Sequence, residues 1–182
     1  TYYLKEDIQS LKEQRREQEK EQQKKGLNIS YPSYEALKAE RIEMAPKIVF
    51  TITNSEGKVV RKLNTTPKRG IQRLYWDMRY ADTDPINLNT SSFYNPWSDS
   101  DKGILVSPGA YKVSMSKIVK GEVIDIGKPI DFIIKALDNR SLPGTDRVVL
   151  NQFNRNLLKL SGAVNAASQT LKEVKNQLKF TL

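Results

Sequence analysis

The 182-residue chain contains neither cysteine nor histidine. The lack of cysteine excludes disulfide bonds, thiolate metal sites and a cysteine nucleophile. The lack of histidine removes the commonest base near neutral pH and the commonest ligand of transition metals. No run of apolar residues approaches the ~18 that a membrane-spanning helix needs, and no signal peptide is visible. The sequence therefore predicts no membrane span, no metal ion and no cofactor.

The charge of the chain is unevenly distributed. The formal net charge is +9 at pH 7. Basic and acidic side chains balance in residues 1–45, so the excess of positive charge lies in residues 46–182. Nucleic-acid-binding domains usually gather their basic side chains on one face or along one helix. The basic residues here are scattered, so the sequence does not predict nucleic-acid binding.

The stretch from Lys47 to Arg79 reads as three strands in a row. Apolar and polar residues alternate over 48–53 and again over 73–79, and residues 58–63 are β-branched and basic. Alternation of this kind, bounded by glycine, proline and asparagine, is typical of half-buried antiparallel strands. Trp76 is expected to lie in the core, because a large aromatic side chain in such a strand contributes most when it is buried.

Four more strands are predicted after this stretch, and one before it. The later strands are expected at 103–106, 110–116, 123–126 and 129–136, and the first strand at 1–5. About seven strands with regular turns is the number typical of an Ig-like sandwich. The fold class predicted is therefore mainly β, an antiparallel sandwich over residues 46–137 with residues 1–5 as its first strand.

Residues 6–45 are predicted to form a helical insertion. Acidic residues at 6 and 7 suit the start of a first helix, and Gly26 suits its end. Every residue from Lys12 to Lys25 is charged or glutamine, which favours a solvated helix with i,i+4 ion pairs. Ser33 is a suitable N-cap for a second helix that is expected over 34–44.

Residues 138–182 are predicted to contain a long helix. Its apolar and small residues alternate in steps of three and four, which is the pattern of a coiled-coil seam. They are Leu150, Phe153, Leu157, Leu160, Val164, Ala167, Leu171, Val174 and Leu178. One seam needs a partner, either a helix beyond residue 182 or the same helix of a second copy. Because the chain starts without methionine and ends within this pattern, it is interpreted as a fragment of a longer protein.

Three segments carry a family resemblance: E-G-K-V-V-R-K-L from position 56, G-I-Q-R-L-Y-W-D from position 70, and S-P-G-A-Y-K-V from position 107. They resemble the Ig-like domain family named after flagellar hook-capping proteins. The likeness is closer to the C-terminal region of bacterial exported proteins with sortilin-like or BNR propeller repeats, which are often labelled glycosyl hydrolases. Residues 1–5 and 31–33 fit the same region. The resemblance implies an Ig-like or fibronectin III-like sandwich with no catalytic site, joined to an upstream β-propeller of the same chain. It also implies a periplasmic, cell-surface or secreted location.

Several acidic residues are candidates for catalytic or metal-binding groups. A glycosidase uses a pair of carboxylates held on rigid elements, and the candidates here have no such fixed spacing: Asp77, Asp82, Asp84, Asp99 and Asp101. Residues 99–103 are similar to the start of a calcium loop but lack its later acidic positions. The sequence therefore predicts no catalytic residue and no metal ligand.

Aromatic residues in the long loop 80–102 are the candidates for ligand binding. Tyr80, Phe93, Tyr94 and Trp97 are able to stack on sugar rings or to pin the loop to the protein. The leading hypothesis is a non-catalytic structural or interaction module that pairs through the C-terminal helix. The alternatives are a carbohydrate-binding module of a glycan-degrading enzyme and a hydrolase domain.

Overall fold

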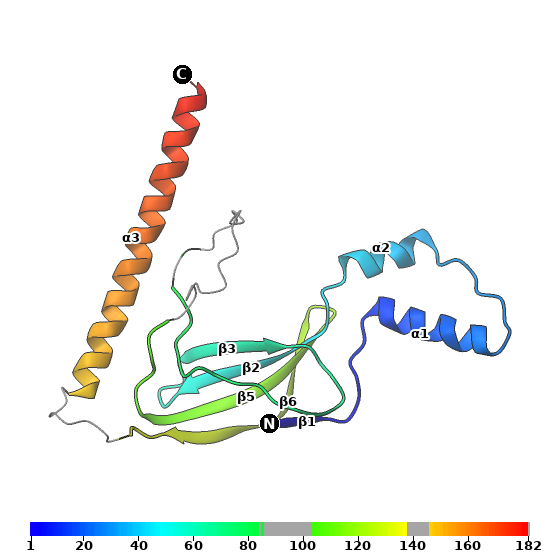
Figure 1. Cartoon of the computed structure of the whole chain (residues 1–182), viewed down its shortest axis with the longest axis horizontal. Coiled ribbons are helices and arrows are strands. Elements are labelled where there is room, and N and C mark those ends of the chain that lie inside the picture. Colours follow the sequence, from blue (N-terminus) through cyan, green and yellow to red (C-terminus); the bar gives the residue numbers. More distant parts are fainter. Residues whose placement is uncertain (84, 86–102, 138–145, 182) are drawn as a thin grey trace. The chain divides into compact units, whose positions relative to one another are not determined.

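The computed structural model describes residues 1–83, 85, 103–137 and 146–181 (Figure 1). The chain forms two compact units, Thr1–Trp76 with Lys112–Phe132 and Asp77–Tyr111 with Ile133–Leu182. The elements in chain order are β1 (Tyr2–Leu4), α1 (Leu11–Lys24), α2 (Tyr34–Ile42), β2 (Lys47–Asn54), β3 (Val59–Thr65), β4 (Gly70–Gln72), β5 (Gly109–Val119), β6 (Glu122–Ile134) and α3 (Arg147–Thr181).

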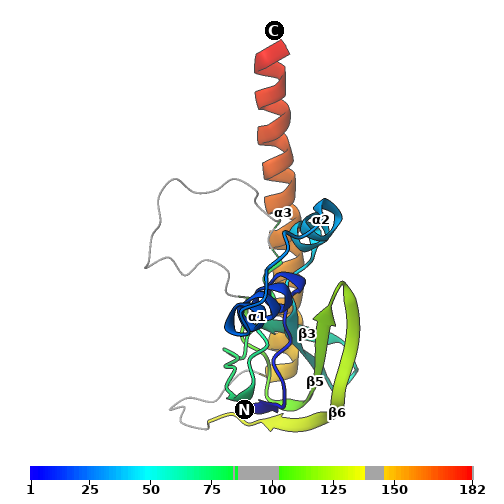
Figure 2. The same ribbon diagram turned by 90° about the vertical axis from the view of Figure 1, so that its right-hand side faces the viewer.

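The larger sheet has the strand order β3-β2-β5-β6. Strands β2 and β3 form an antiparallel hairpin in which Phe50 lies opposite Leu63. The Asn54 side chain fixes the turn between them, because its Oδ1 accepts hydrogen bonds from the backbone N–H groups of Glu56 at 3.1 Å and Lys58 at 2.8 Å. Strands β5 and β6 form a second long hairpin, and both figures show the two strands side by side (Figures 1 and 2).

The core lies on and around β2, one of the two strands with neighbours on both sides. Ile48, Ile52 and Val60 are almost completely buried. A second sheet, formed by β1 and β4, is antiparallel and only three residues long in each strand. From this sheet the Tyr2 ring packs on Phe50 with 4.9 Å between ring centroids. The two layers form a sandwich-like β fold, with one layer much smaller than the other. The described chain as a whole is mixed α/β and not mainly β as predicted, because its three helices hold more residues than its six strands.

Several predicted strands differ from the observed ones. The first strand is confirmed as β1. The predicted strands 123–126 and 129–136 are one continuous strand, β6, which accommodates Pro129 because it lies at the edge of the sheet. The prediction of a strand over 103–106 was wrong: these residues make only an isolated bridge, Arg79 with Leu105. The described residues therefore contain six strands in place of about seven.

The predicted strand over 73–79 is also wrong. Strand β4 ends at Gln72, and Met78 has a φ of 57°. A left-handed φ interrupts an extended strand. Trp76 is half-buried, not fully buried, and its ring packs edge-on against Phe132 with 6.2 Å between centroids. The core role of Trp76 is thus confirmed only in part.

Helix α1 begins later than predicted. Ser10 is its N-cap, and the Ser10 and Glu13 side chains form a capping box that satisfies two backbone N–H groups at this end. The Ser10 hydrogen bonds also lower the pKa of the Glu13 carboxyl. Residues 6 and 7 lie outside the helix, and Asp7 instead accepts a hydrogen bond from the backbone N–H of Arg69 at 2.7 Å.

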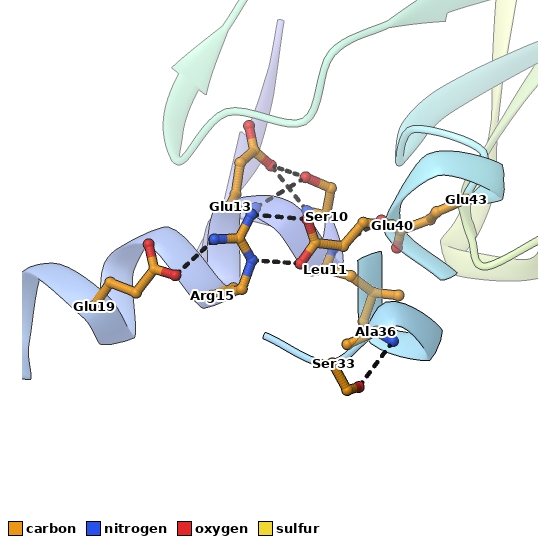
Figure 3. Close-up of polar contacts among 9 residues, drawn as sticks. All are labelled: Ser10, Leu11, Glu13, Arg15, Glu19, Ser33, Ala36, Glu40 and Glu43. Carbon is orange, nitrogen blue, oxygen red and sulfur yellow. Dashed lines mark hydrogen bonds and ion pairs between the residues drawn. The ribbon is translucent and has the colours of Figure 1, made fainter. Parts of the chain in front are cut away.

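Helices α1 and α2 are joined by polar contacts (Figure 3). The Arg15 guanidinium donates to both carboxylate oxygens of Glu40, at 2.5 and 3.0 Å, and to Glu19 at 2.6 Å. The backbone N–H of Leu11 donates to the Glu43 carboxylate at 2.7 Å. The predicted N-cap Ser33 is confirmed, with its hydroxyl accepting from Ala36 N. A charged helix thus acquires a partner helix through side-chain hydrogen bonds.

Candidate functional site

The longest row of exposed apolar side chains among the described residues lies on α3. Asp146 starts this helix, because its side chain accepts from Val148 N at 2.8 Å and its carbonyl from Leu150 N at 3.0 Å. The predicted coiled-coil residues follow one another along a single continuous helix. The large ones are between 44% and 62% exposed: Leu150, Phe153, Leu157, Leu160, Val164, Leu171, Val174 and Leu178. We call these residues, with Ala167, the apolar stripe.

A different face of α3 is docked within the same unit. The Arg155 guanidinium lies 5.6 Å from the centroid of the Tyr80 ring, within the range of a cation–π contact. The Thr83 hydroxyl donates to the carbonyl of Leu158 at 3.2 Å. A Cβ on Gly162 would lie 2.8 Å from the Thr83 carbonyl oxygen, so glycine permits the close approach. The Asn151 amide donates to the Ser107 hydroxyl.

The docked face and the apolar stripe lie on opposite sides of the helix. At about 100° per residue, the positions 151, 155, 158 and 162 are roughly 150° around the axis from the apolar stripe. The docked face therefore leaves the apolar stripe uncovered. The sequence did not reveal this docked face, although its positions are also spaced in steps of three and four. It was missed because asparagine, arginine and glycine do not indicate burial by their hydropathy.

The residues beside the apolar stripe are almost all uncharged. Small, hydroxyl or amide side chains occupy the flanking positions Asn154, Asn156, Ser161, Ala163, Ser168 and Thr170. Lys175 is the charged exception, near the C-terminal end of the stripe. Charges at these positions set partner choice and orientation in coiled coils. Their scarcity means that like-charge repulsion does not oppose the pairing of two copies.

Tyr80 and Tyr111 lie close to one another in the second unit. The buried Tyr111 phenol donates to the carbonyl of Ser107 at 2.6 Å. Burial raises the pKa of this phenol, the Tyr80 phenol raises it further, and Arg155 acts in the opposite direction. Because Arg155 covers one face of the Tyr80 ring, that face is not available to a sugar. Phe93, Tyr94 and Trp97 lie outside the described residues, so carbohydrate binding by the loop stays a prediction.

The acidic residues do not form a described site. The Asp77 carboxylate accepts from Arg79 N at 3.1 Å, which is a local turn contact. Asp84, Asp99 and Asp101 lie outside the described residues. Over residues 1–83, 103–137 and 146–179 there is no group of three acidic side chains placed to hold a metal ion. Nor does this part of the chain include a helix with the length and apolar content needed to cross a membrane.

The first unit contains a cavity of about 700 Å³ between its two β layers. Its floor is the face of the larger sheet that carries Phe50, Val113 and Phe132, and Tyr2 and Trp76 lie along its sides. Of these residues, Trp76 was predicted to lie in the core. The cavity exists because β1 and β4 are too short to cover the whole face of the larger sheet.

Comparison with protein-family models, curated proteins and solved structures finds no match to this chain.

Proposed function

We propose that this chain is a non-catalytic structural and interaction module that pairs with a second copy of itself through the apolar stripe of α3. The observation that carries the proposal is the exposure of this stripe along a continuous 35-residue helix. A large apolar side chain contributes about 1.5–3 kcal/mol when it is moved from water into a packed interface. Eight such side chains in coiled-coil spacing make pairing more favourable than exposure.

A second copy is the partner that fits the stripe best. Its leucines occur at both alternating positions, so each faces an apolar residue when the same helix is placed against it. The uncharged flanks remove the repulsion that a chain of net charge +9 would otherwise show toward its own copy. The charged residues of the helix are concentrated beyond residue 171, where Lys172, Lys175 and Lys179 limit the strength of pairing.

The wider setting of the module is also part of the proposal. The segments that resemble the C-terminal region of exported propeller proteins coincide with β3, with the region of β4 and with the start of β5. On this resemblance we place the module in a larger exported protein with an upstream β-propeller, where it would act as an Ig-like appendage. Pairing through α3 would then hold two such proteins together.

Sedimentation velocity over a range of protein concentrations tests the pairing. The wild-type chain should pass from monomer to dimer as concentration rises. Leu157→Asp should weaken the dimer by about 100-fold, because each copy contributes one buried leucine worth about tenfold or more. Ala166→Asp is the matched control, since it adds the same charge on the same helix away from the apolar stripe.

The outcome that contradicts the proposal is equally simple. A wild-type chain that remains monomeric at every concentration, with α3 still helical by circular dichroism, would show that the stripe does not pair. Equal weakening by Leu157→Asp and Ala166→Asp would show that the charge, and not the apolar contact, controls association.

A further inference from the structure

We propose that the cavity in the first unit binds a single-chain amphiphile, a saturated aliphatic chain that ends in one anionic group such as a carboxylate. The cavity volume of about 700 Å³ lies within the range of about 300–1,000 Å³ that small-molecule sites occupy. All of its lining residues belong to the first unit, Thr1–Trp76 and Lys112–Phe132. The site is separate from α3 and from the pairing proposed above.

The body of the cavity has the chemistry of an aliphatic chain. Its walls carry the rings of Phe50, Trp76 and Phe132 and the aliphatic side chains of Leu63, Val113 and Met115. The Ser114 hydroxyl, which also lines the cavity, already donates to the carbonyl of Thr51 at 3.4 Å. The cavity is open on one side, and its apolar walls favour an apolar ligand because water finds few hydrogen-bond partners on them.

The charge at the cavity selects the head group of the ligand. No aspartate or glutamate occurs among the lining residues, and Lys128 is the one lysine or arginine among them. Lys128 is exposed and follows Gly127, whose φ of 72° turns the chain at this point of β6. A lysine at the edge of an apolar cavity attracts an anion while the chain of the ligand is buried. A neutral or cationic head group would gain no such contact.

The test uses octanoate, decanoate and dodecanoate, each kept below its critical micelle concentration, with dodecanol as the uncharged probe. Binding is followed by the fluorescence of Trp76 in a Trp97→Phe background, because the chain has two tryptophans. Each added methylene that is buried should raise the affinity by roughly fourfold. Dodecanoate should bind more tightly than dodecanol, by up to about fivefold for one exposed charge pair.

Two variant pairs localise the binding. Ile130 lines the cavity and is 66% exposed, whereas Ile133 on the same strand is 69% exposed and does not line it. Ile130→Asp should weaken dodecanoate binding by about tenfold or more, since it places a carboxylate beside the ligand. Ile133→Asp should leave binding unchanged. Lys128→Glu should remove the preference for dodecanoate over dodecanol, and Lys135→Glu is its control.

Affinity that does not depend on chain length would overturn the proposal. So would equal losses from Ile130→Asp and Ile133→Asp, because both results indicate adsorption to the general surface. Thermal unfolding of each variant shows whether it is folded. If Ile130→Asp does not fold, the Lys128→Glu comparison decides between the two outcomes, because Lys128 is exposed and its replacement spares the core.

Discussion

The two helical regions of the chain satisfy opposite requirements. Helix α1 is polar from Lys12 to Lys24, yet it has a partner: Arg15 binds Glu40 of α2 with two hydrogen bonds (Figure 3). Helix α3 carries a long apolar stripe, yet that stripe is exposed in the single chain. Helix α1, which was expected to be solvated, has a partner helix. Helix α3, whose apolar stripe was expected to need a partner, has none over that stripe within the described residues.

This difference teaches what each kind of sequence signal can specify. Hydrophobic burial is non-directional, so a stripe predicts that a surface will be covered without saying by what. A bidentate contact between arginine and a carboxylate is directional, but it involves two ordinary charged residues 25 positions apart. The chain contains many arginines and glutamates, so the sequence does not show which two of them form this contact. Three predictions test the contrast directly and one, at Tyr111, tests the packing of the unit that contains α3; their expected effects run from the largest to the smallest.

The first prediction concerns protein concentration. If α3 pairs with a second copy, its helix should become more stable as concentration rises, whereas the α1–α2 hairpin should not respond. A hundredfold excess over the dissociation constant corresponds to about 2.7 kcal/mol of stabilisation by mass action. Hydrogen exchange followed by mass spectrometry reports the two regions separately in one sample. If protection from hydrogen exchange rises equally in α1 and α3, the stabilisation is not specific to α3, and pairing through the apolar stripe is contradicted.

The second prediction concerns the docked face of α3. Gly162→Leu should destabilise the second unit by about 1–3 kcal/mol, because the new side chain must displace the Thr83 carbonyl. The dimer should be unaffected, since Gly162 lies away from the apolar stripe. Ala166→Leu, at an exposed position on the same helix, is the control and should change stability little. Denaturant unfolding and sedimentation together distinguish the two faces.

The same contrast explains how much of the fold was predictable. Alternation predicted the β2–β3 hairpin, and spacing predicted α3, because both patterns are local. The strand predicted over 73–79 does not form, because Met78 adopts a left-handed φ. Nothing about a methionine side chain predicts this backbone conformation. The start of α1 was misplaced because acidic residues at 6 and 7 resemble a first turn, whereas the capping box of Ser10 and Glu13 decides it.

The candidate sites were less predictable than the fold. The apolar stripe was found because it is periodic. The cavity was not predicted, because its lining residues come from segments that lie far apart in the chain. Only the shortness of β1 and β4 makes those residues line a space, and strand length at the edge of a sheet depends on pairing between distant segments.

The third prediction concerns Tyr111. Tyr111→Phe should cost about 1 kcal/mol at pH 8, because it removes the hydrogen bond to the Ser107 carbonyl. Burial raises the pKa of the folded phenol above its ordinary value of 10.0. The folded state therefore holds this proton at a pH where the unfolded state releases it. Stability is complete below pH 10 and falls as the pH rises through the folded pKa.

The cost of Tyr111→Phe should consequently shrink above pH 10, since the variant has no proton to lose. Tyr75→Phe is the control, because the Tyr75 side chain is 80% exposed. The free energy of unfolding at a series of pH values measures both. If the two variants follow parallel curves through this range, Tyr111 is not buried in the way described.

The smallest effect is expected at Arg15, and it tests the hairpin side of the contrast. Arg15→Ala should loosen α1 from α2, while Arg16→Ala, a neighbouring arginine with an exposed side chain, should not. The effect is small because the Arg15 side chain is still 25% exposed and water competes for it.

The hydrogen bonds from Arg15 lower the pKa of the Glu40 carboxyl below its ordinary value of 4.5. A lowered folded pKa means that the pair stabilises the hairpin above pH 4.5, and that this contribution is lost as the pH falls through the folded pKa. In Arg15→Ala the Glu40 pKa should return toward 4.5, and in Arg16→Ala it should stay low, as carboxyl chemical shifts in an NMR titration would show. Should Glu40 titrate identically in both variants, Arg15 would not be the cause of its low pKa, and the contact between α1 and α2 would not depend on this ion pair.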